Sequence, residues 1–458
     1  MKRYDYLIVG NSAAGVSALE AIRETDKKSS VLVISSEPYP AYGTPLISYV
    51  LEGKIAEKDM WYKSASFYED MQADTLFGLD YSATALDAKA HELTLLNGDT
   101  YRYGKLLVAT GSTPAQVNIP SLAGAKNASN FLTLDQAKQA GAAVDEATKR
   151  AHAQGRKSRV MVLGGGLIGM KAAEALSFHA DEVVVYKRSF PILDGVLDME
   201  AGALISRMVE PHGVKCRPGA SAERFDVDDG YITHAVMTDG TELDVDYVIV
   251  AIGVRPNSFL AVAAGAEEGR GLVVDRRMHT SLSDVYAAGD VTQTTNTLDG
   301  TNKPLALWPN AVRQGRIAGA QMAGSSSEGV FVGNFAVNAT NFFGEVSLLT
   351  SGIVRPKPEQ RYEERVFVDG DTYRKFVVKD DRLFGFILIN CPEAAGIYTF
   401  IIDKKVPLSS LDEGLFDGEP GNLSFKNPDL QWFRMHVGYP HELDRYGRGE
   451  NYPWHEEG

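Results

Sequence analysis

Residues 159–178 read RVMVLGGGLIGMKAAEALSF. Arg159 to Leu163 predicts a buried strand, and Met170 to Phe178 predicts a helix. The turn between them has glycine at positions 164, 166 and 169, which is the complete GxGxxG spacing. These glycines permit a tight turn and a close approach of helix and strand, and the free N–H groups at the helix start can bind a pyrophosphate. The stretch therefore predicts a Rossmann-type dinucleotide-binding unit.

A second, less complete copy of this pattern opens the chain. Tyr4 to Val9 predicts a strand, GNSAAG follows at 10–15, and Val16 to Glu24 predicts a helix. Serine replaces the middle glycine, but it is small enough for a close backbone approach. The next predicted strand, Val31 to Ile34, leads to Glu37, whose carboxylate can accept hydrogen bonds from ribose hydroxyls. The alternative is a glycine-rich turn of another α/β fold, with Glu37 in solvent.

The end of the second predicted strand in the unit that begins at Arg159 indicates which coenzyme is bound. The strand predicted over Glu182 to Tyr186 is followed by Lys187 and Arg188, where a carboxylate would normally hold the ribose diol of NAD. Cations at this place suit a 2′-phosphate, which favours NADPH or weak discrimination between the two coenzymes. The alternative is that both side chains point into solvent.

Composition limits the class of protein. The 458 residues suggest roughly three domains. The formal charge of −14 argues against nucleic-acid binding, which needs a basic face. No apolar run reaches the roughly 18 residues of a membrane helix, and no signal-peptide pattern precedes the first strand. We expect a cytoplasmic protein without membrane insertion.

The chain has two cysteines, Cys216 and Cys391, far apart in sequence. No CxxC redox pair and no set of four cysteines for an iron–sulfur cluster is present. We expect no metal site, and each cysteine is better explained as a small buried side chain than as a nucleophile.

Three further strands that end in glycine turns link the two fingerprints. They are Lys105 to Gly111, Tyr247 to Gly253, and Val285 to Asp290. With these segments the chain resembles the FAD-dependent pyridine nucleotide-disulfide oxidoreductase superfamily over nearly its whole length. The resemblance implies an α/β fold with two Rossmann-like nucleotide-binding domains, the NAD(P) domain inserted in the FAD domain, and an α+β C-terminal interface domain. The implied boundaries are 1–115 and 255–325 for the FAD domain, 155–250 for the NAD(P) domain, 326–430 for the interface domain and 431–458 for a C-terminal extension.

The resemblance also implies which residues hold the cofactors. For FAD they are Gly10, Ser12, Ala13, Ala14, Gly15, Glu37, Pro45, Ala83, Ala109, Thr110, Gly111, Gly289, Asp290, Trp308 and Ala311. For NAD(P)H they are Gly164, Gly166, Leu167, Ile168, Gly169, Lys187, Arg188 and Gly253. Asp290 is expected to bind the ribityl chain, although a helix N-cap would favour the same residue type. No side chain is expected to act as catalytic acid, base or nucleophile, because the hydride chemistry belongs to the cofactors.

Residues 38–48, PYPAYGTPLIS, distinguish between branches of this superfamily. They resemble the corresponding segment of rubredoxin reductases and of the flavin part of bacterial nitrite reductases. Disulfide reductases carry their reactive cysteine here, and this chain has none before Cys216. Residues 337–344 and 383–402 resemble the flavin subunits of phenylglyoxylate dehydrogenase and of tungsten aldehyde oxidoreductase complexes.

These likenesses imply an FAD-dependent NAD(P)H:acceptor oxidoreductase that exchanges single electrons with an iron–sulfur partner, as the flavin subunit of a larger complex. Two alternatives stay open. One is a stand-alone NAD(P)H oxidase or rubredoxin reductase, and the other is a flavin-bound scaffold or redox-responsive binding protein. The sequence leaves open whether the chain forms a homo-oligomer and in which direction electrons flow.

Overall fold

The computed structural model describes residues 1–411 and 413–416. They form two compact units: Met1–Leu193 with Val209–Phe335, and Asp194–Met208 with the chain from Ala336 onward. The predicted extension 431–458 lies outside the described residues. Most of the predicted FAD and NAD(P) domains falls within the first unit, but residues 194–208 of the predicted NAD(P) domain belong to the second, and the division stays a prediction.

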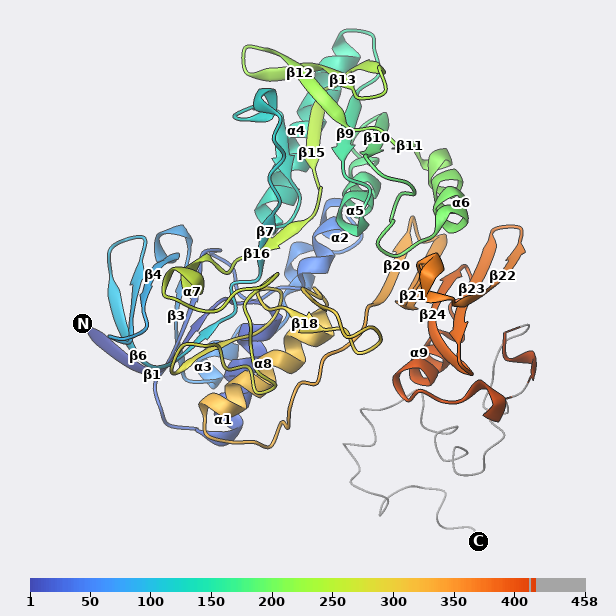
Figure 1. Ribbon diagram of the computed structural model, residues 1–458. Helices are drawn as coiled ribbons and strands as arrows, with labels where there is room; N and C mark the ends of the chain where they lie inside the picture. Colours follow the sequence, from blue (N-terminus) through green and yellow to red (C-terminus); the bar gives the residue numbers. More distant parts are fainter. Residues whose placement is uncertain (412, 417–458) are drawn as a thin grey trace. The chain divides into compact units, whose positions relative to one another are not determined.

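The first sheet of this unit has the strand order β3-β2-β1-β6-β5-β4, with β17 paired to β6 (Figure 1). Strands β3, β2, β1, β6 and β17 run parallel to one another. Strand β5 pairs antiparallel with β6 on one side and with β4 on the other. The strands are β1 (Lys2–Val9), β2 (Val31–Ser35), β3 (Ala73–Phe77), β4 (Ala83–Asp87), β5 (Glu92–Leu95), β6 (Thr100–Val108) and β17 (Val285–Ala287). The central strands are apolar on both faces because both faces are covered.

The second sheet is parallel, with the order β11-β10-β9-β15-β8. Its strands are β8 (Ala128–Asn130), β9 (Arg159–Leu163), β10 (Glu182–Lys187), β11 (Val214–Pro218) and β15 (Tyr247–Val250). A three-stranded antiparallel sheet shares an apolar core with one of its faces. The three strands are β12 (Ala222–Asp228), β13 (Tyr231–Met237) and β14 (Glu242–Asp244).

Two short strands join these layers. The chain leaves the first sheet through β7 (Ser112–Pro114) and returns through β16 (Val254–Pro256), and the two strands pair antiparallel. Thr110 Oγ1 donates a hydrogen bond of 2.8 Å to the carbonyl oxygen of Asn257 just below this pair. A smaller pair is formed by β18 (Thr294–Thr295) and β19 (Asn302–Lys303).

The helices of the first unit pack on these sheets. They are α1 (Ala13–Thr25), α2 (Ile47–Leu51), α3 (Phe67–Asp70), α4 (Leu134–Ala153), α5 (Leu167–Leu176), α7 (Phe259–Ala263) and α8 (Trp308–Met322). Both fingerprint helices begin three residues before the predicted starts, Val16 and Met170, so the second half of each glycine turn is already helical. Helix α5 also ends at Leu176 rather than at Phe178, and the Ser177 hydroxyl donates a hydrogen bond to the Glu174 carbonyl oxygen.

The second unit is built on an antiparallel sheet with the order β20-β21-β24-β23-β22. Its elements are α6 (Met199–Val209), β20 (Val337–Phe342), β21 (Val346–Gly352), β22 (Glu363–Asp369), β23 (Thr372–Lys379), β24 (Arg382–Ile389) and α9 (Ala395–Asp403). Asp198 accepts hydrogen bonds of 2.8 Å from Tyr373 Oη and Lys375 Nζ, which ties the residues before α6 to β23.

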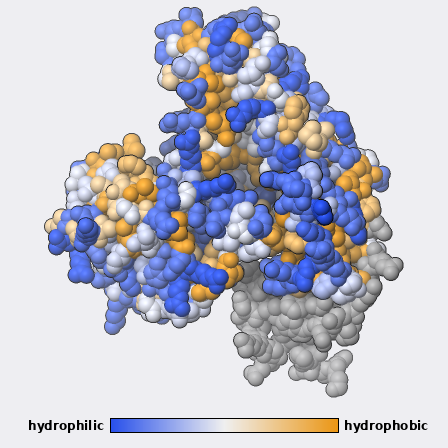
Figure 2. Space-filling model, in the orientation of Figure 1, coloured by the Kyte–Doolittle hydropathy of each residue, from blue (hydrophilic) through white to orange (hydrophobic). Residues whose placement is uncertain are grey.

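No helix within residues 1–411 and 413–416 combines the length and apolar character needed to cross a membrane. Polar residues cover most of the face seen in Figure 2, and apolar residues gather there only in small patches.

Helices α1 and α8 pack side by side at unusually close range (Figure 1). A Cβ atom on Gly319 would lie 2.2 Å from the carbonyl oxygen of Ala18, and one on Gly315 would lie 2.2 Å from that of Ala14. Because both obstacles are backbone atoms, the helices would have to separate to admit any side chain.

We therefore expect Gly319→Ala to lower the free energy of unfolding by about 1–3 kcal/mol, because the added methyl group overpacks this contact. Calorimetry measures the change. Gly396→Ala in α9 is the control: it too lies in a helix, but its Cβ would meet no atom within 4 Å. An equal loss in both variants would show that the close contact is not the cause.

Candidate functional site

The first glycine turn joins β1 to α1. Gly10 has φ +123°, and a Cβ on it would lie 2.0 Å from the carbonyl oxygen of Ala109. A Cβ on Gly15 would lie 1.9 Å from the Gly10 carbonyl oxygen. Ser12 is the N-cap residue of α1, and its side chain makes no capping hydrogen bond. The first N–H groups of the helix therefore remain for a ligand such as a pyrophosphate.

The ends of two further elements meet the start of α1. A Cβ on Gly289 would lie 3.2 Å from the Ala14 side chain and 3.7 Å from that of Ala311 in α8. The turn after β17 and the first turns of α1 and α8 thus bring three of the residues predicted to bind FAD close together. The N–H of Gly289 donates to Gln314 Oε1 at 2.7 Å, which holds the turn beside α8.

Asp290 follows directly, and burial raises the pKa of its carboxyl group. No charged neighbour contributes to that shift. A buried acid without a compensating cation is costly to ionise, and a ligand that supplies hydroxyl donors would lower this cost. The environment fits the ribityl hydroxyls of FAD.

Glu37 lies after β2, and burial raises the pKa of its carboxyl group as well. Tyr42 Oη donates to Glu37 Oε2 at 2.6 Å and accepts from the backbone N–H of Leu134 at 3.3 Å. The sequence does not predict these two hydrogen bonds of Tyr42, although Tyr42 lies in the segment 38–48 that distinguishes the branches of the superfamily. The second carboxylate oxygen of Glu37 is left for the predicted ribose contact.

The other predicted FAD residues lie on several further elements, and Ala83 lies on the edge strand β4. Thr110 and Gly111 follow β6 beside Ala109, and Gly111 has φ +66°. Pro45 lies in a 3-10 turn at 44–46, and Trp308 begins α8 with its ring edge-on to Tyr62 at a centroid distance of 5.2 Å. Ala83 lies in β4, where it pairs with Leu95.

The second glycine turn repeats the geometry of the first. Gly164 has φ +113°, and a Cβ on it would lie 2.2 Å from the Ala251 carbonyl oxygen. A Cβ on Gly169 would lie 1.8 Å from the Gly164 carbonyl oxygen. Gly166 is the N-cap of α5, and its Cβ position is open. Leu167 and Ile168 form the first helical residues, and Gly253 follows β15 with φ +118°.

Lys187 and Arg188 lie beside this turn. Lys187 is the last residue of β10, and its Cδ would lie 3.2 Å from a Cβ on Gly165. The lysine stem therefore runs along the glycine turn, while Arg188 is exposed. No sequence pattern indicated Leu193, whose backbone N–H donates a hydrogen bond of 2.6 Å to the Gly165 carbonyl oxygen.

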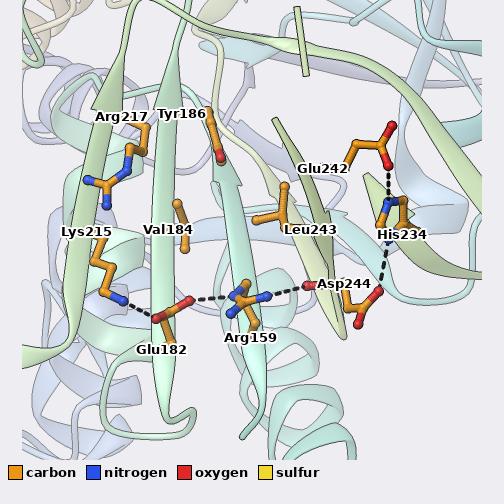
Figure 3. A pocket seen from close by; sticks show the side chains of 10 residues that line it. All are labelled: Arg159, Glu182, Val184, Tyr186, Lys215, Arg217, His234, Glu242, Leu243 and Asp244. Carbon is orange, nitrogen blue, oxygen red and sulfur yellow. Dashed lines mark hydrogen bonds and ion pairs between the residues drawn. The ribbon is translucent and has the colours of Figure 1, made fainter. Parts of the chain in front are cut away.

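A polar cavity of about 420 Å³ lies elsewhere on the second sheet (Figure 3). Glu182 forms ion pairs with Arg159 and Lys215, and His234 pairs with Asp244 at 2.9 Å. Arg159 and Glu182 begin β9 and β10, whereas dinucleotides bind at the carboxyl ends of parallel strands. The glycine turn, rather than this cavity, stays the candidate coenzyme site.

The surroundings of Cys391 are not those of a reactive thiol. Burial raises the pKa of Cys391 to about 11, which keeps it protonated at neutral pH. Cys216 lies within β11. Within residues 1–411 and 413–416, no three His, Cys, Asp or Glu side chains gather in a way that could hold a metal ion.

Comparison with known proteins identifies the family. Residues 4–315, about two thirds of the chain, match the family model of pyridine nucleotide-disulphide oxidoreductases. This chain belongs to that family. Its members bind FAD and NAD(P)H, so the two glycine turns belong to a flavin-dependent NAD(P)H oxidoreductase.

Three similar proteins cover different functions within the family. The epsilon subunit of NADH-dependent phenylglyoxylate dehydrogenase from Aromatoleum evansii is 28% identical over 89% of this chain and 93% of its own length. The ferredoxin reductase subunit of 5,5′-dehydrodivanillate O-demethylase from a Sphingobium species is 30% identical over 63% and 68%. The covalent complex of putidaredoxin reductase with putidaredoxin matches with a TM-score of 0.77, 22% identity and coverage of 92% and 97%, which supports the fold.

For this oxidoreductase, we expect Asp290→Asn to yield protein with little bound flavin, measured as FAD absorbance per chain after purification. A fully yellow variant would remove Asp290 from the FAD site. Asp275→Asn is the control, because Asp275 caps a surface turn through His279 and Arg277.

The same substitution should alter the pH dependence of stability in flavin-free protein. Because the folded-state pKa of Asp290 is raised, its protonated form favours folding at low pH, and that contribution is lost as pH rises through the raised pKa. We expect flavin-free Asp290→Asn to be more stable than flavin-free parent at neutral pH, and the difference to shrink on acidification. Thermal unfolding across this pH range measures it, and parallel pH profiles would contradict it.

Proposed function

We propose that this chain is the flavin subunit of a larger NAD(P)H:acceptor oxidoreductase. A hydride passes between the nicotinamide of NAD(P)H and FAD, and the flavin exchanges single electrons with an iron–sulfur partner. The direction in the cell is either oxidation of NAD(P)H or reduction of NAD(P)+ at the expense of another subunit.

The absence of a thiol relay carries this proposal. A disulfide reductase passes electrons from flavin to a cysteine beside it, and residues 38–48 contain no cysteine. Cys391 is held as a neutral thiol by burial, and a neutral thiol is a poor nucleophile. Electrons that reach the flavin therefore leave to an acceptor outside this chain.

The protein's own contribution is to bind and orient. The glycine turns present helix N-termini to the two pyrophosphates, and Asp290 and Glu37 offer carboxylates to hydroxyl groups of FAD. Hydride transfer between stacked rings requires correct placement rather than a side-chain acid or base.

Two relatives support the choice of partner. One is a subunit of phenylglyoxylate dehydrogenase, and another is a ferredoxin reductase subunit of a demethylase. Both work within larger systems. Ferredoxins are iron–sulfur proteins, so the name of the second relative supports an iron–sulfur partner for this chain.

Lys187 and Arg188 support a preference for NADPH. Lys187 lies at the end of β10 with its stem along the glycine turn, so its ammonium group and the exposed guanidinium of Arg188 belong to the region where the adenosine ribose is expected. A 2′-phosphate would gain charge-assisted contacts there.

We expect Lys187→Glu to lower kcat/KM for NADPH relative to NADH by about tenfold, because one phosphate contact is replaced by a repulsion. Steady-state kinetics with an artificial acceptor measure the ratio. Lys157→Glu makes the same charge change before the start of β9 and should leave the ratio unaltered. An unchanged ratio in Lys187→Glu would show that the end of β10 does not determine the preference between NADPH and NADH.

The electron path is tested by anaerobic mixing of the purified flavoprotein with NADPH or NADH, together with isolation of its complexes from native lysate. Fast flavin bleaching and co-purified iron–sulfur subunits support the complex. Fast bleaching with strong dioxygen or rubredoxin turnover, and no such partner, would favour a stand-alone oxidase or rubredoxin reductase. Failure of both coenzymes to bleach the flavin would favour the scaffold.

A further inference from the structure

A buried charge cluster joins α2 to α5, away from the glycine turns themselves. It consists of two carboxylates, Glu52 and Glu174, and two ammonium groups, Lys54 and Lys171. The carboxylate side chains are 0% and 1% exposed, and those of Lys171 and Lys54 are 15% and 39% exposed. The four charges sum to zero.

Each ammonium group contacts both carboxylates. Lys54 Nζ lies 2.6 Å from Glu52 Oε2 and 3.3 Å from Glu174 Oε1. Lys171 Nζ lies 3.7 Å from Glu52 Oε1 and forms a short ion pair with Glu174. It also lies 4.4 Å from the centroid of the Tyr49 ring in α2. Lys171 of α5 therefore contacts both Tyr49 in α2 and Glu52 directly after it.

Stability alone does not explain such a cluster. Removing two carboxylates from water is expensive, and apolar side chains of similar size usually serve stability equally well or better. Burial raises the pKa of Glu52 despite the two lysines, which shows that desolvation outweighs their attraction. Buried ionic groups can instead specify one arrangement of neighbouring elements, because any other arrangement strands a charge.

The arrangement specified here connects both candidate cofactor sites. Helix α2 has only five residues and follows the 3-10 turn that contains Pro45. Lys171 lies one helical turn beyond Leu167, the first residue of α5 after the second glycine turn. A second contact supports the first: His179 bonds to the carbonyl oxygen of Leu51 at 3.0 Å and to Asp145 of α4 at 2.8 Å.

We propose that Lys171 is a positioning residue for hydride transfer. Its ammonium group, held between Glu52 and Glu174, fixes α5 against α2 and so sets the placement of the nicotinamide relative to the flavin. This role rests on the proposed function. Reacting atoms must approach to about 3–3.5 Å, and a displacement of about 1 Å can slow a reaction by about 100-fold.

The test uses the FAD-containing protein and four variants. Lys171→Met removes the cation, and Lys171→Arg restores it. Lys171→Gln with Glu174→Gln removes one charge of each sign and leaves the Lys54–Glu52 pair, so it covers the case in which the single methionine variant fails to fold. Lys138→Met is the control, because it breaks an exposed ion pair of α4 with Glu57.

Anaerobic stopped flow with NADPH gives the limiting rate of flavin reduction and the coenzyme Kd. We expect Lys171→Met and the double variant to lower the limiting rate by about 10- to 100-fold and to keep Kd within about twofold. Lys171→Arg should restore most of the rate, Lys138→Met should not alter it, and reduction by dithionite should be equally fast in all. Hydrogen exchange of the α2 and α5 amides should become faster in Lys171→Met and in the double variant, and in neither of the other two variants.

The outcomes separate the two proposals. If neither NADPH nor NADH bleaches the parent protein, the proposed function fails. If the parent is bleached, and Lys171→Met and the double variant reach its limiting rate with unchanged amide exchange, the positioning role is wrong. A slower dithionite reaction in these variants would overturn it too, because the damage would then lie in the flavin site itself.

Discussion

The rest of the structure depends on one constraint. At each of the two glycine turns the helix N-terminus approaches the end of the preceding strand so closely that only glycine, which has no side chain, fits. At Gly15 and Gly169 the helix backbone comes so close to the preceding turn that a Cβ would lie less than 2 Å from a carbonyl oxygen. That approach places each helix start at the carboxyl edge of its sheet. Asp290 and Glu37 can take the roles predicted for them only because the helix starts have a fixed position at this edge of the sheet.

Much of the fold follows from local sequence, and the reasons are visible in particular residues. The strand Arg159–Leu163 coincides with its prediction because a buried apolar strand and a glycine turn are both encoded within a few positions. Helix starts were predicted three residues late, since the glycine spacing does not distinguish turn from first helical residues. The hydrogen bond between Tyr42 and the Leu134 backbone joins residues 92 positions apart, and the one between Asp198 and Lys375 of β23 joins residues 177 positions apart. Such pairings have no local signal.

The candidate site is characterised by the burial of its carboxyl groups rather than by reactive side chains. Burial raises the pKa values of Glu37 and Asp290 at the first glycine turn and of Glu52 beside α5. No lysine or arginine contributes to the pKa shifts of the first two, whereas Glu52 forms ion pairs with two lysines of the chain itself. The proposed uses of these carboxyl groups therefore differ, ligand binding in one place and the relative placement of two helices in another, and the sequence alone does not separate them.

The antiparallel pairing of β7 with β16 has a consequence for how such chains arise. Because the polypeptide leaves and re-enters the first sheet through two adjacent strands, the whole stretch between them begins and ends at one point in space. A segment with neighbouring ends can be gained, lost or exchanged as a cassette without re-threading the sheet that receives it. Exchange of the predicted coenzyme-binding segment would have to keep this two-stranded junction, together with residues 194–208, which belong to the second unit.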